Sequence, residues 1–302
     1  MNTDYPDDRL SGETPLRQAQ LVMLRILKVF HSICEDEGLR YWLDAGTLLG
    51  AVRHGGFIPW DDDVDVLMPR EDYLRFCAVA PSRLPPDMFF QSPETDPGFV
   101  CPWIKIRDRY SYIDEATGPY PYSQAIFIDV FPAVMETERE HAWRNYYSLL
   151  PPLHKKPEGP SRSLPLRSNA KRILSCLVQY SFIALMKVPF VAGPFLRFLG
   201  CGTKAWAYEP PIRWRNFFPD EIVFPLRKIK FEGFEFWGPA DADRYLSDYY
   251  GDYMKLPPPE RRVSEHSVEA IFPVGPNPHF SGLRWEDRIL PDGSRIDGDK
   301  HP

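Results

Sequence analysis

The chain has 302 residues, of which 43% are hydrophobic and 26% charged, enough for two average domains or one elaborated domain. Its 33 prolines argue against a bundle of long helices, because a proline inside a helix costs about 3 kcal/mol. A net charge of −6 argues against general binding to nucleic-acid phosphates. We therefore expect a looped, well-packed protein with no nucleic-acid partner.

The cysteines and the first residues indicate a compartment. The five cysteines are odd in number and none has CxxC spacing, so neither a disulfide framework nor a zinc site is predicted. The first residues are polar and acidic, without the basic and apolar segments of a signal peptide. We expect a reducing, cytoplasmic location.

The N-terminal third alternates helices and short strands. Residues 15–38 carry an apolar stripe at three- and four-residue steps, with Thr14 as N-cap and Gly38 as C-cap, which predicts a helix. Further on, the patterns predict a strand at 39–45, a short helix at 46–53, a loop at 54–61, a strand at 62–68 and a helix at 70–79.

Strands and helices continue without a regular βαβ period. Prolines interrupt 81–102, and the next predicted elements are strands at 101–107, 110–114 and 125–131 and a helix at 136–150. Later segments are two apolar stretches at 173–186 and 188–199, an aromatic strand at 231–237, an acidic helix at 240–250 and a proline loop at 251–262. This succession predicts an α+β (mixed α/β) class.

Two interpretations of residues 155–199 remain open. The uncharged run at 173–186 is too short to span about 30 Å of hydrocarbon as a helix. Because a basic segment precedes it, one interpretation is an interfacial helix that gives peripheral contact with the inner face of a membrane. The other is a buried helix pair that packs on the rest of the protein.

The acidic run at 61–65 is the most informative motif. If 62–68 is a strand, Asp63 and Asp65 share one face while Val64 packs inward, and Asp61 lies at the mouth of that face. Adjacent carboxylates repel unless a cation neutralises them, and hard oxygen ligands favour Mg²⁺ or Mn²⁺. One alternative is a solvated acidic loop. A calcium loop is rejected, because Val66 occupies the position that requires glycine.

Two further motifs support a phosphate-handling site. Gly46 and Thr47 precede a short helix, where backbone N–H groups and a hydroxyl favour an anion. Asp129 is a single charge in an apolar strand, so it needs a partner such as a cation or an arginine. An ordinary buried Asp–Arg pair is the alternative for Asp129. Together the motifs fit metal-assisted phosphoryl transfer.

At these residues the chain resembles a known family. The stretch AGTLLGAVRHGGFIPWDDDVD at 45–65 is similar to the LicD family of the nucleotidyltransferase superfamily, which includes the fukutin-type proteins. The resemblance continues in KIR at 105–107, FIDVFP at 127–132 and YGDYMKLPP at 250–258. It implies a nucleotidyltransferase-like core at 15–150 with a small mixed sheet flanked by helices, a helical insertion at 151–215, and a C-terminal part with loops at 216–302.

The resemblance also implies a reaction. Family members transfer a phospho-alcohol, such as phosphocholine or ribitol phosphate, from a CDP-linked donor to a glycan or teichoic-acid-like acceptor, which can be lipid-linked. Asp63 and Asp65 would then hold Mg²⁺ (or Mn²⁺), and Asp129 would complete the metal site or accept the proton of the attacking hydroxyl. The expected substrate-binding residues are Gly46, Thr47, Arg53, His54, Asp61, Lys105 and Arg107.

Several alternatives remain open. Each basic candidate is equally consistent with a surface charge or an ion pair with the aspartates. Trp60 is a candidate for stacking a base or for the core, and His266 for a lid over the site. The reaction has one rival within enzymology, attack on a nucleoside triphosphate with release of pyrophosphate. The other rival is a catalytically inactive carbohydrate- or partner-binding module of the same fold.

Overall fold

A computed structural model of the chain describes residues 5–114, 122–148, 189–212, 214, 216–264 and 266–271. The chain divides into two compact units, one formed by Met1–Val134 with Glu221–Pro302 and the other by Met135–Asp220. The domain boundaries predicted at 150 and 215 stay predictions. The apolar stretch 173–186 and the basic segment before it lie outside the described residues.

The first unit is built on a mixed sheet. Its strands follow the order β1-β2-β6-β4-β3, in which β2 and β6 are parallel and the other neighbours antiparallel. They are β1 (Trp42–Leu43), β2 (Asp65–Pro69), β3 (Met88–Gln91), β4 (Ile104–Asp108) and β6 (Phe127–Thr137), the last running on into the second unit. With its helices, this sheet confirms the predicted α+β class.

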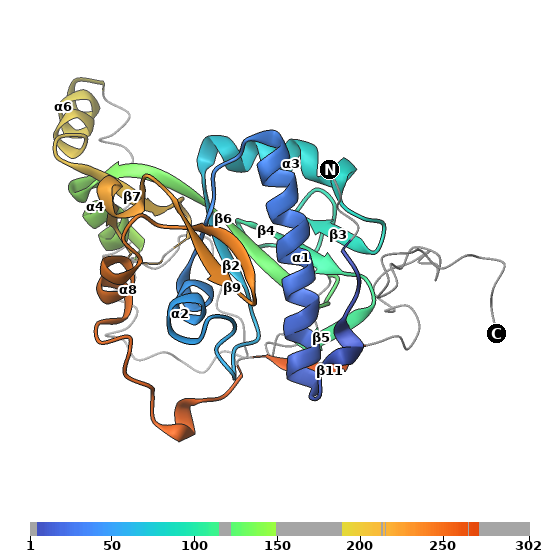
Figure 1. The fold of residues 1–302 in the computed structure, drawn as a ribbon. Helices are drawn as coiled ribbons and strands as arrows, with labels where there is room; N and C mark the ends of the chain where they lie inside the picture. Colours follow the sequence, from blue (N-terminus) through green and yellow to red (C-terminus); the bar gives the residue numbers. More distant parts are fainter. Residues whose placement is uncertain are drawn as a thin grey trace, which may run out of the picture. The chain divides into compact units, whose positions relative to one another are not determined.

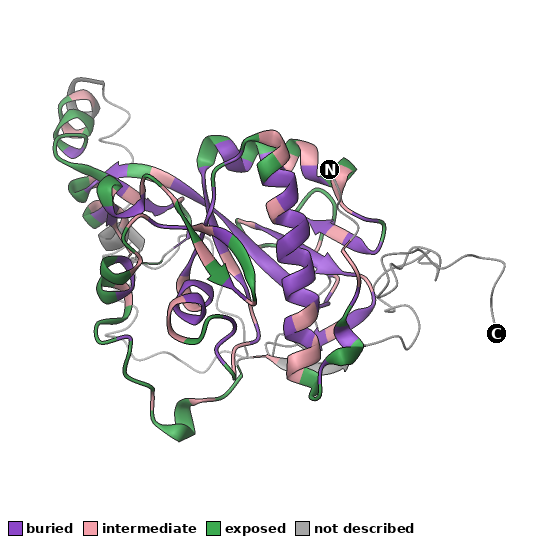
Figure 2. Cartoon of the chain, viewed as in Figure 1, coloured by how far each residue is buried: buried purple, intermediate pink, exposed green. Residues whose placement is uncertain are grey.

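Helices α1 (Pro15–Glu37) and α3 (Arg70–Arg83) pack against each other, with the rings of Phe30 and Phe76 4.9 Å apart (Figure 1). Helix α1 begins and ends as predicted. The Thr14 hydroxyl accepts the N–H of Arg17 at 3.2 Å, and Gly38 ends the helix at φ 61°. Most of α1 is buried, because its apolar stripe supplies much of the core (Figure 2).

The remaining elements of the first unit are shorter. They are the 3₁₀ turns η1 (Arg9–Ser11) and η2 (Pro259–Arg261), α2 (Ala45–His54), α8 (Ala242–Tyr250), and the paired strands β5 (Ser111–Asp114) and β11 (Ser267–Ile271). Helix α7 (Asp220–Val223) begins at the last residue of the second unit.

The strand predicted over 231–237 is confirmed at 234–237, but the turn at its start was not predicted. The residues form the hairpin of β9 (Arg227–Phe231) and β10 (Phe234–Gly238). Its turn residues Glu232 and Gly233 have φ angles of 51° and 78°, the positive values that a tight two-residue hairpin turn requires. Glutamate seldom adopts this conformation, so the sequence pattern did not reveal the turn.

The second unit contains α4 (Glu138–Ser148), α6 (Pro189–Leu199) and the antiparallel pair β7 (Lys204–Tyr208) and β8 (Phe218–Pro219). On α6, Leu196 and Phe198 are more than half exposed. Among the described residues, none of the helices has the length and apolar character needed to cross a membrane. The peripheral contact through 155–199 stays a prediction, since 155–188 lies outside the described residues.

Candidate active site

The acidic run lies where two parallel strands begin. Strand β2 starts at Asp65, three residues later than the strand predicted at 62–68, so Asp63 precedes the observed strand. The carbonyl of Val64 accepts the N–H of Asp129 at 2.8 Å, which ties the acidic run to β6. Asp65 and Asp129 are register partners in β2 and β6, so their side chains lie on the same face of the sheet.

Asp63 and Asp65 carry uncompensated charge. Both are half-buried, and within the described residues no hydrogen-bond donor contacts either carboxylate. Burial, followed by the charges of Asp61 and Asp129, raises the pKa of Asp63 well above its ordinary value. Burial and the charge of Asp63 likewise raise the pKa of Asp65. The ionised pair is therefore unfavourable unless a cation joins it.

Asp129, in contrast, has protein partners. Its Oδ1 accepts the indole N–H of Trp103 at 2.6 Å, and the ammonium of Lys105 lies 3.4 Å from both carboxylate oxygens. The same ammonium lies 3.3 Å from the centre of the Phe127 ring. The sequence predicted a cation or an arginine beside Asp129, and the structure supplies a lysine and an indole.

Gly46 and Thr47 shape the acidic run. The Thr47 hydroxyl, 2% exposed, accepts the N–H of Asp65 at 2.9 Å. A Cβ added at Gly46 would lie 2.8 Å from Asp61 Oδ2, so glycine allows that carboxylate to approach the helix backbone. Thr47 thus holds the backbone of Asp65, and Gly46 makes room for the carboxylate of Asp61. Their predicted contact with a donor phosphate stays a prediction.

The basic candidates Arg53 and His54 lie in different surroundings. Arg53 donates to the carbonyl of Tyr253 at 2.7 Å, and burial lowers its pKa despite the nearby charge of Asp61. His54 is exposed, and burial and the charge of Arg53 lower its pKa. Arg53 therefore lies at the edge of the acidic run, while His54 faces solvent.

Arg107 belongs to the core. Its side chain is fully buried, and its guanidinium donates to Gln91 Oε1 and to the carbonyl of Ala125, both at 2.5 Å. The alternation along β4 correctly predicts that Lys105 and Arg107 share a face. Lys105 is opposite Asp129 and contacts its carboxylate, whereas Arg107 is opposite Phe127, two residues further along β4.

Sequence reasoning missed two residues near the carboxylates. Asp44 is fully buried and accepts the hydroxyl of Tyr245 at 2.6 Å, while its N–H donates to the carbonyl of Asp65. Desolvation of its hydroxyl and the charges of Tyr249, Asp44 and Asp65 raise the pKa of Tyr250, although 43% of the residue is exposed. Asp44 had a usable signal, since an aspartate directly before a helix is a typical N-cap.

The loop before the acidic run is held from two other elements. Gln20 of α1 donates to the carbonyls of Ile58 and Asp61, at 3.3 and 2.9 Å. Glu232, in the β9–β10 turn, accepts the N–H of Phe57 at 3.1 Å and both terminal nitrogens of Arg17. These contacts come from distant parts of the sequence and had no local signature.

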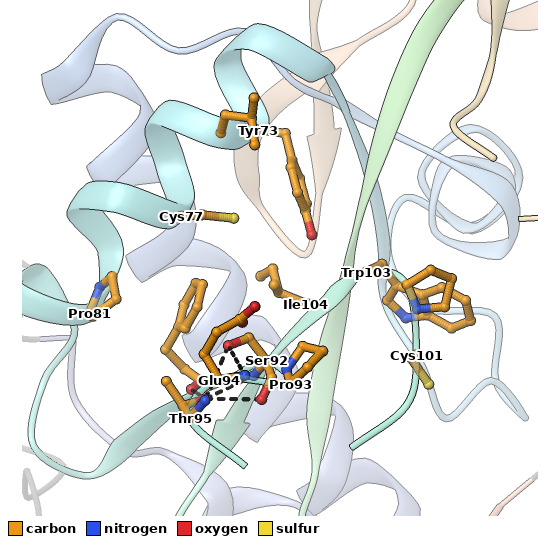
Figure 3. A pocket seen from close by; sticks show the side chains of 13 residues that line it. Tyr73, Cys77, Pro81, Ser92, Pro93, Glu94, Thr95, Cys101, Trp103 and Ile104 are labelled. Atoms are coloured by element: carbon orange, nitrogen blue, oxygen red, sulfur yellow. Dashed lines mark hydrogen bonds between the residues drawn. The ribbon is translucent and has the colours of Figure 1, made fainter. Parts of the chain in front are cut away.

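A separate pocket lies on the face of the sheet opposite to the one that carries Lys105 and Asp129. Its volume is about 510 Å³, and its lining combines residues of α3, such as Tyr73 and Cys77, with Phe90 and Ile104 of the sheet (Figure 3). Strand alternation directs Ile104 away from the face that carries Lys105. Trp103 lines one end of this pocket while its indole N–H holds Asp129.

The oxygen ligands of the site suit a divalent cation that also binds phosphate and water. Within the part of the chain that the structure describes, no three His, Cys, Asp or Glu side chains form a metal site by themselves. Mg²⁺, however, is usually held by one or two carboxylates together with phosphate oxygens and water. Asp63 and Asp65, which receive no hydrogen bond from the described residues, offer oxygen ligands that fit that arrangement.

Comparison with known proteins identifies the family. The family described as LicD/FKTN/FKRP, nucleotidyltransferase domain, matches residues 38–158. The lipopolysaccharide cholinephosphotransferase LicD of Haemophilus influenzae is 31% identical over 285 residues, which cover 85% of this chain and 98% of that protein.

Two further similarities are short. The human ribitol 5-phosphate transferase FKRP is 58% identical over 40 residues, 13% of this chain and 8% of that protein. An uncharacterized protein of Rickettsia typhi is 41% identical over 61 residues, 20% of each chain. Because the similarity to the Haemophilus protein covers nearly all of that protein, this chain belongs to the LicD family.

Proposed function

We propose that this protein is a metal-assisted transferase that moves a phospho-alcohol, phosphocholine-like or a polyol phosphate, from a CDP-linked donor to a glycan acceptor. Two relatives support the reaction class, because their names describe a cholinephosphotransferase acting on lipopolysaccharide and a ribitol 5-phosphate transferase. The CDP-linked donor, the metal, and an acceptor that is teichoic-acid-like or lipid-linked are the finer parts of the proposal.

The observation that carries the proposal is the state of Asp63 and Asp65. Two half-buried carboxylates repel each other, and within the described residues they have no hydrogen-bond donor. Such an arrangement costs free energy in a protein that uses it only as structure. Mg²⁺ or Mn²⁺ bound there would neutralise the donor diphosphate and support the departure of CMP.

The chain's own groups have distinct tasks in this proposal. The acceptor hydroxyl forms a new P–O bond to the phosphorus that carries the alcohol, and the P–O bond to CMP breaks with its electron pair leaving on CMP. Asp129 receives the hydroxyl proton or, if it instead completes the metal site, that proton passes to water; Lys105 and Trp103 keep its carboxylate oriented in either case. Thr47 keeps Asp65 in place.

The substrate-binding assignments are narrower than those from sequence. Asp61 remains a candidate as part of the acidic run, and Gly46 and Arg53 remain candidates because they lie beside it. His54 remains a candidate at its exposed edge. We leave Arg107 out of the proposed donor contacts, because its side chain is fully buried and donates to Gln91 and to the carbonyl of Ala125.

A donor screen tests the proposal. The purified protein is incubated with CDP-choline, CDP-ribitol, CDP-glycerol or nucleoside triphosphates, each with an acceptor glycan, Mg²⁺ and, in parallel, a chelator. Phosphorus NMR follows the products. We expect CMP from one CDP-linked donor, loss of turnover with chelator, and loss of turnover in Asp63→Asn.

The outcomes separate the alternatives. Pyrophosphate release from a nucleoside triphosphate would replace the proposal with a nucleotidyltransferase. Turnover that persists with chelator would show that the reaction does not need a metal. Glycan binding without turnover of any donor would indicate an inactive carbohydrate-binding module.

A further inference from the structure

A long exposed segment borders the acidic run. Residues 251–266, here called the strap, connect α8 to β11 and are exposed at most positions up to residue 264 (Figure 2). The strap is attached to the site near both ends. Arg53 donates to the carbonyl of Tyr253, and the hydroxyl of Ser264 donates to the carbonyl of Trp60 at 3.0 Å.

The last residue of the strap contacts the acidic run directly. The backbone N–H of His266 donates to Asp62 Oδ2 at 2.6 Å, and its ring Nδ1 lies 3.3 Å from Asp62 Oδ1. Because a carboxylate only accepts, this ring contact requires a proton on Nδ1. Asp62 itself is 2% exposed, whereas Asp61 and Asp63 on either side are half-buried.

These contacts make Asp62 different from its neighbours. Both of its oxygens lie against His266, so its carboxylate is directed toward the strap. The chain on either side is held as well, by Gln20 at the carbonyl of Asp61 and by the N–H of Asp129 at the carbonyl of Val64. Hydrogen bonds therefore hold the chain around Asp63 at three places: the carbonyl of Asp61, the side chain of Asp62 and the carbonyl of Val64.

We propose that His266 and Asp62 form a positioning pair that fixes the direction of the Asp63 carboxylate, so that the strap determines how well the site binds a divalent cation. The inference rests on the proposed function, because it concerns the same metal site. Neither residue is assigned contact with substrate. Groups that orient metal ligands without binding the metal typically change affinity about 10- to 100-fold when they are removed.

Mn²⁺ titrations of the full chain, followed by electron paramagnetic resonance of the free ion, test this pair without relying on turnover. Asp62→Ala removes both acceptors, and we expect its Mn²⁺ affinity to fall about 10- to 100-fold. Asp62→Asn keeps one oxygen for the His266 N–H, so its affinity should stay within a few-fold of wild type. His266→Ala keeps the backbone donor and should fall between the two.

Asp72→Ala is the matched control. Asp72 is another buried aspartate, 4% exposed, but its partner is Arg40 Nε at 2.7 Å and it lies on α3. We expect Asp72→Ala to lower the melting temperature and to bind Mn²⁺ like wild type. If Asp62→Ala does not fold, His266→Ala decides, and a wild-type Mn²⁺ affinity in that variant would overturn the positioning role.

The outcomes also separate this inference from the proposed function. If wild type binds Mn²⁺ and Asp62→Ala binds it equally well, the positioning pair alone is overturned. If Asp62→Asn loses as much affinity as Asp62→Ala, the charge of Asp62 matters and its hydrogen bond does not, which also overturns the pair. If wild type binds no Mn²⁺, the metal-assisted function fails and the pair fails with it.

Discussion

Replacing Thr47 by valine distinguishes a positioning role from a phosphate-binding role. Strand β1 ends at Leu43, so the ladder beside Asp65 is short, and the Thr47 hydroxyl supplies the acceptor for the Asp65 N–H. Valine has nearly the same shape but no oxygen. The N–H would lose its partner at a site where Thr47 is only 2% exposed.

The cost follows from that lost acceptor. A buried donor left without a partner costs about 1–3 kcal/mol. For a folding unit of roughly 150–250 residues, each kcal/mol shifts the melting temperature by about 2–4 °C. We therefore expect Thr47→Val to melt roughly 2–12 °C below wild type. Asp65 would also shift, so kcat should fall about 10- to 100-fold.

Differential scanning fluorimetry and steady-state kinetics together check the reasoning. Thr47→Ser is the control, because it keeps the hydroxyl and loses one buried methyl, worth about 1 kcal/mol. We expect the serine variant to retain most of the activity. A valine variant with the wild-type melting temperature and a raised KM for the donor would refute the positioning role and favour phosphate contact.

Three further predictions concern charge and packing. Asp63→Asn should abolish turnover. Its melting temperature at neutral pH should equal or exceed that of wild type, because the raised pKa of Asp63 makes its ionised carboxylate destabilising. This gain in melting temperature should shrink as pH falls toward about 4, where the carboxylate of the unfolded chain also takes up a proton, and a larger gain at low pH would contradict the reasoning. Lys105→Met should lower the free energy of unfolding by about 3–5 kcal/mol, because it leaves the buried carboxylate of Asp129 without its cation, and urea titration measures the loss. Gly50→Ala should lower the free energy of unfolding by about 1–3 kcal/mol, because the new Cβ would lie 2.5 Å from a backbone carbonyl oxygen. The control is Gly193→Ala on α6, where the new Cβ meets open space, and this variant should be neutral or stabilising in the same titration.

The sequence predicted the elements that depend on local signals. Helix α1 has its cap residues and its apolar stripe in one continuous segment, so Thr14 and Gly38 marked its ends to within a residue. The β9–β10 hairpin failed the same approach, because its turn depends on a glutamate with positive φ. That conformation is supported by contacts of Glu232 with Arg17 and Phe57, which are remote in sequence.

In the candidate site, too, features with a local signal were predicted and features that depend on remote contacts were not. Spacing correctly placed Lys105 and Arg107 on one face of β4, but it could not show that Arg107 is fully buried. A lone aspartate in an apolar strand correctly indicated that Asp129 needs a partner. The identity of that partner follows from the pairing of β4 with β6, which sets Lys105 opposite Asp129. Pairing between distant strands has no local signature in a single sequence.

The acidic residues of the site are chemically alike in sequence and unlike in the fold. Asp62 is held by His266, and Asp129 is held by Lys105 and Trp103, so both have partners within the protein. Asp65 lies on the same face of the sheet as Asp129, with Asp63 just before its strand, and neither Asp63 nor Asp65 has a hydrogen-bond donor from the described residues. A diphosphate brought to that face would add negative charge to negative charge. Because Lys105 is already committed to Asp129, we propose that a cation from solution balances this charge, with Asp63 and Asp65 as its ligands.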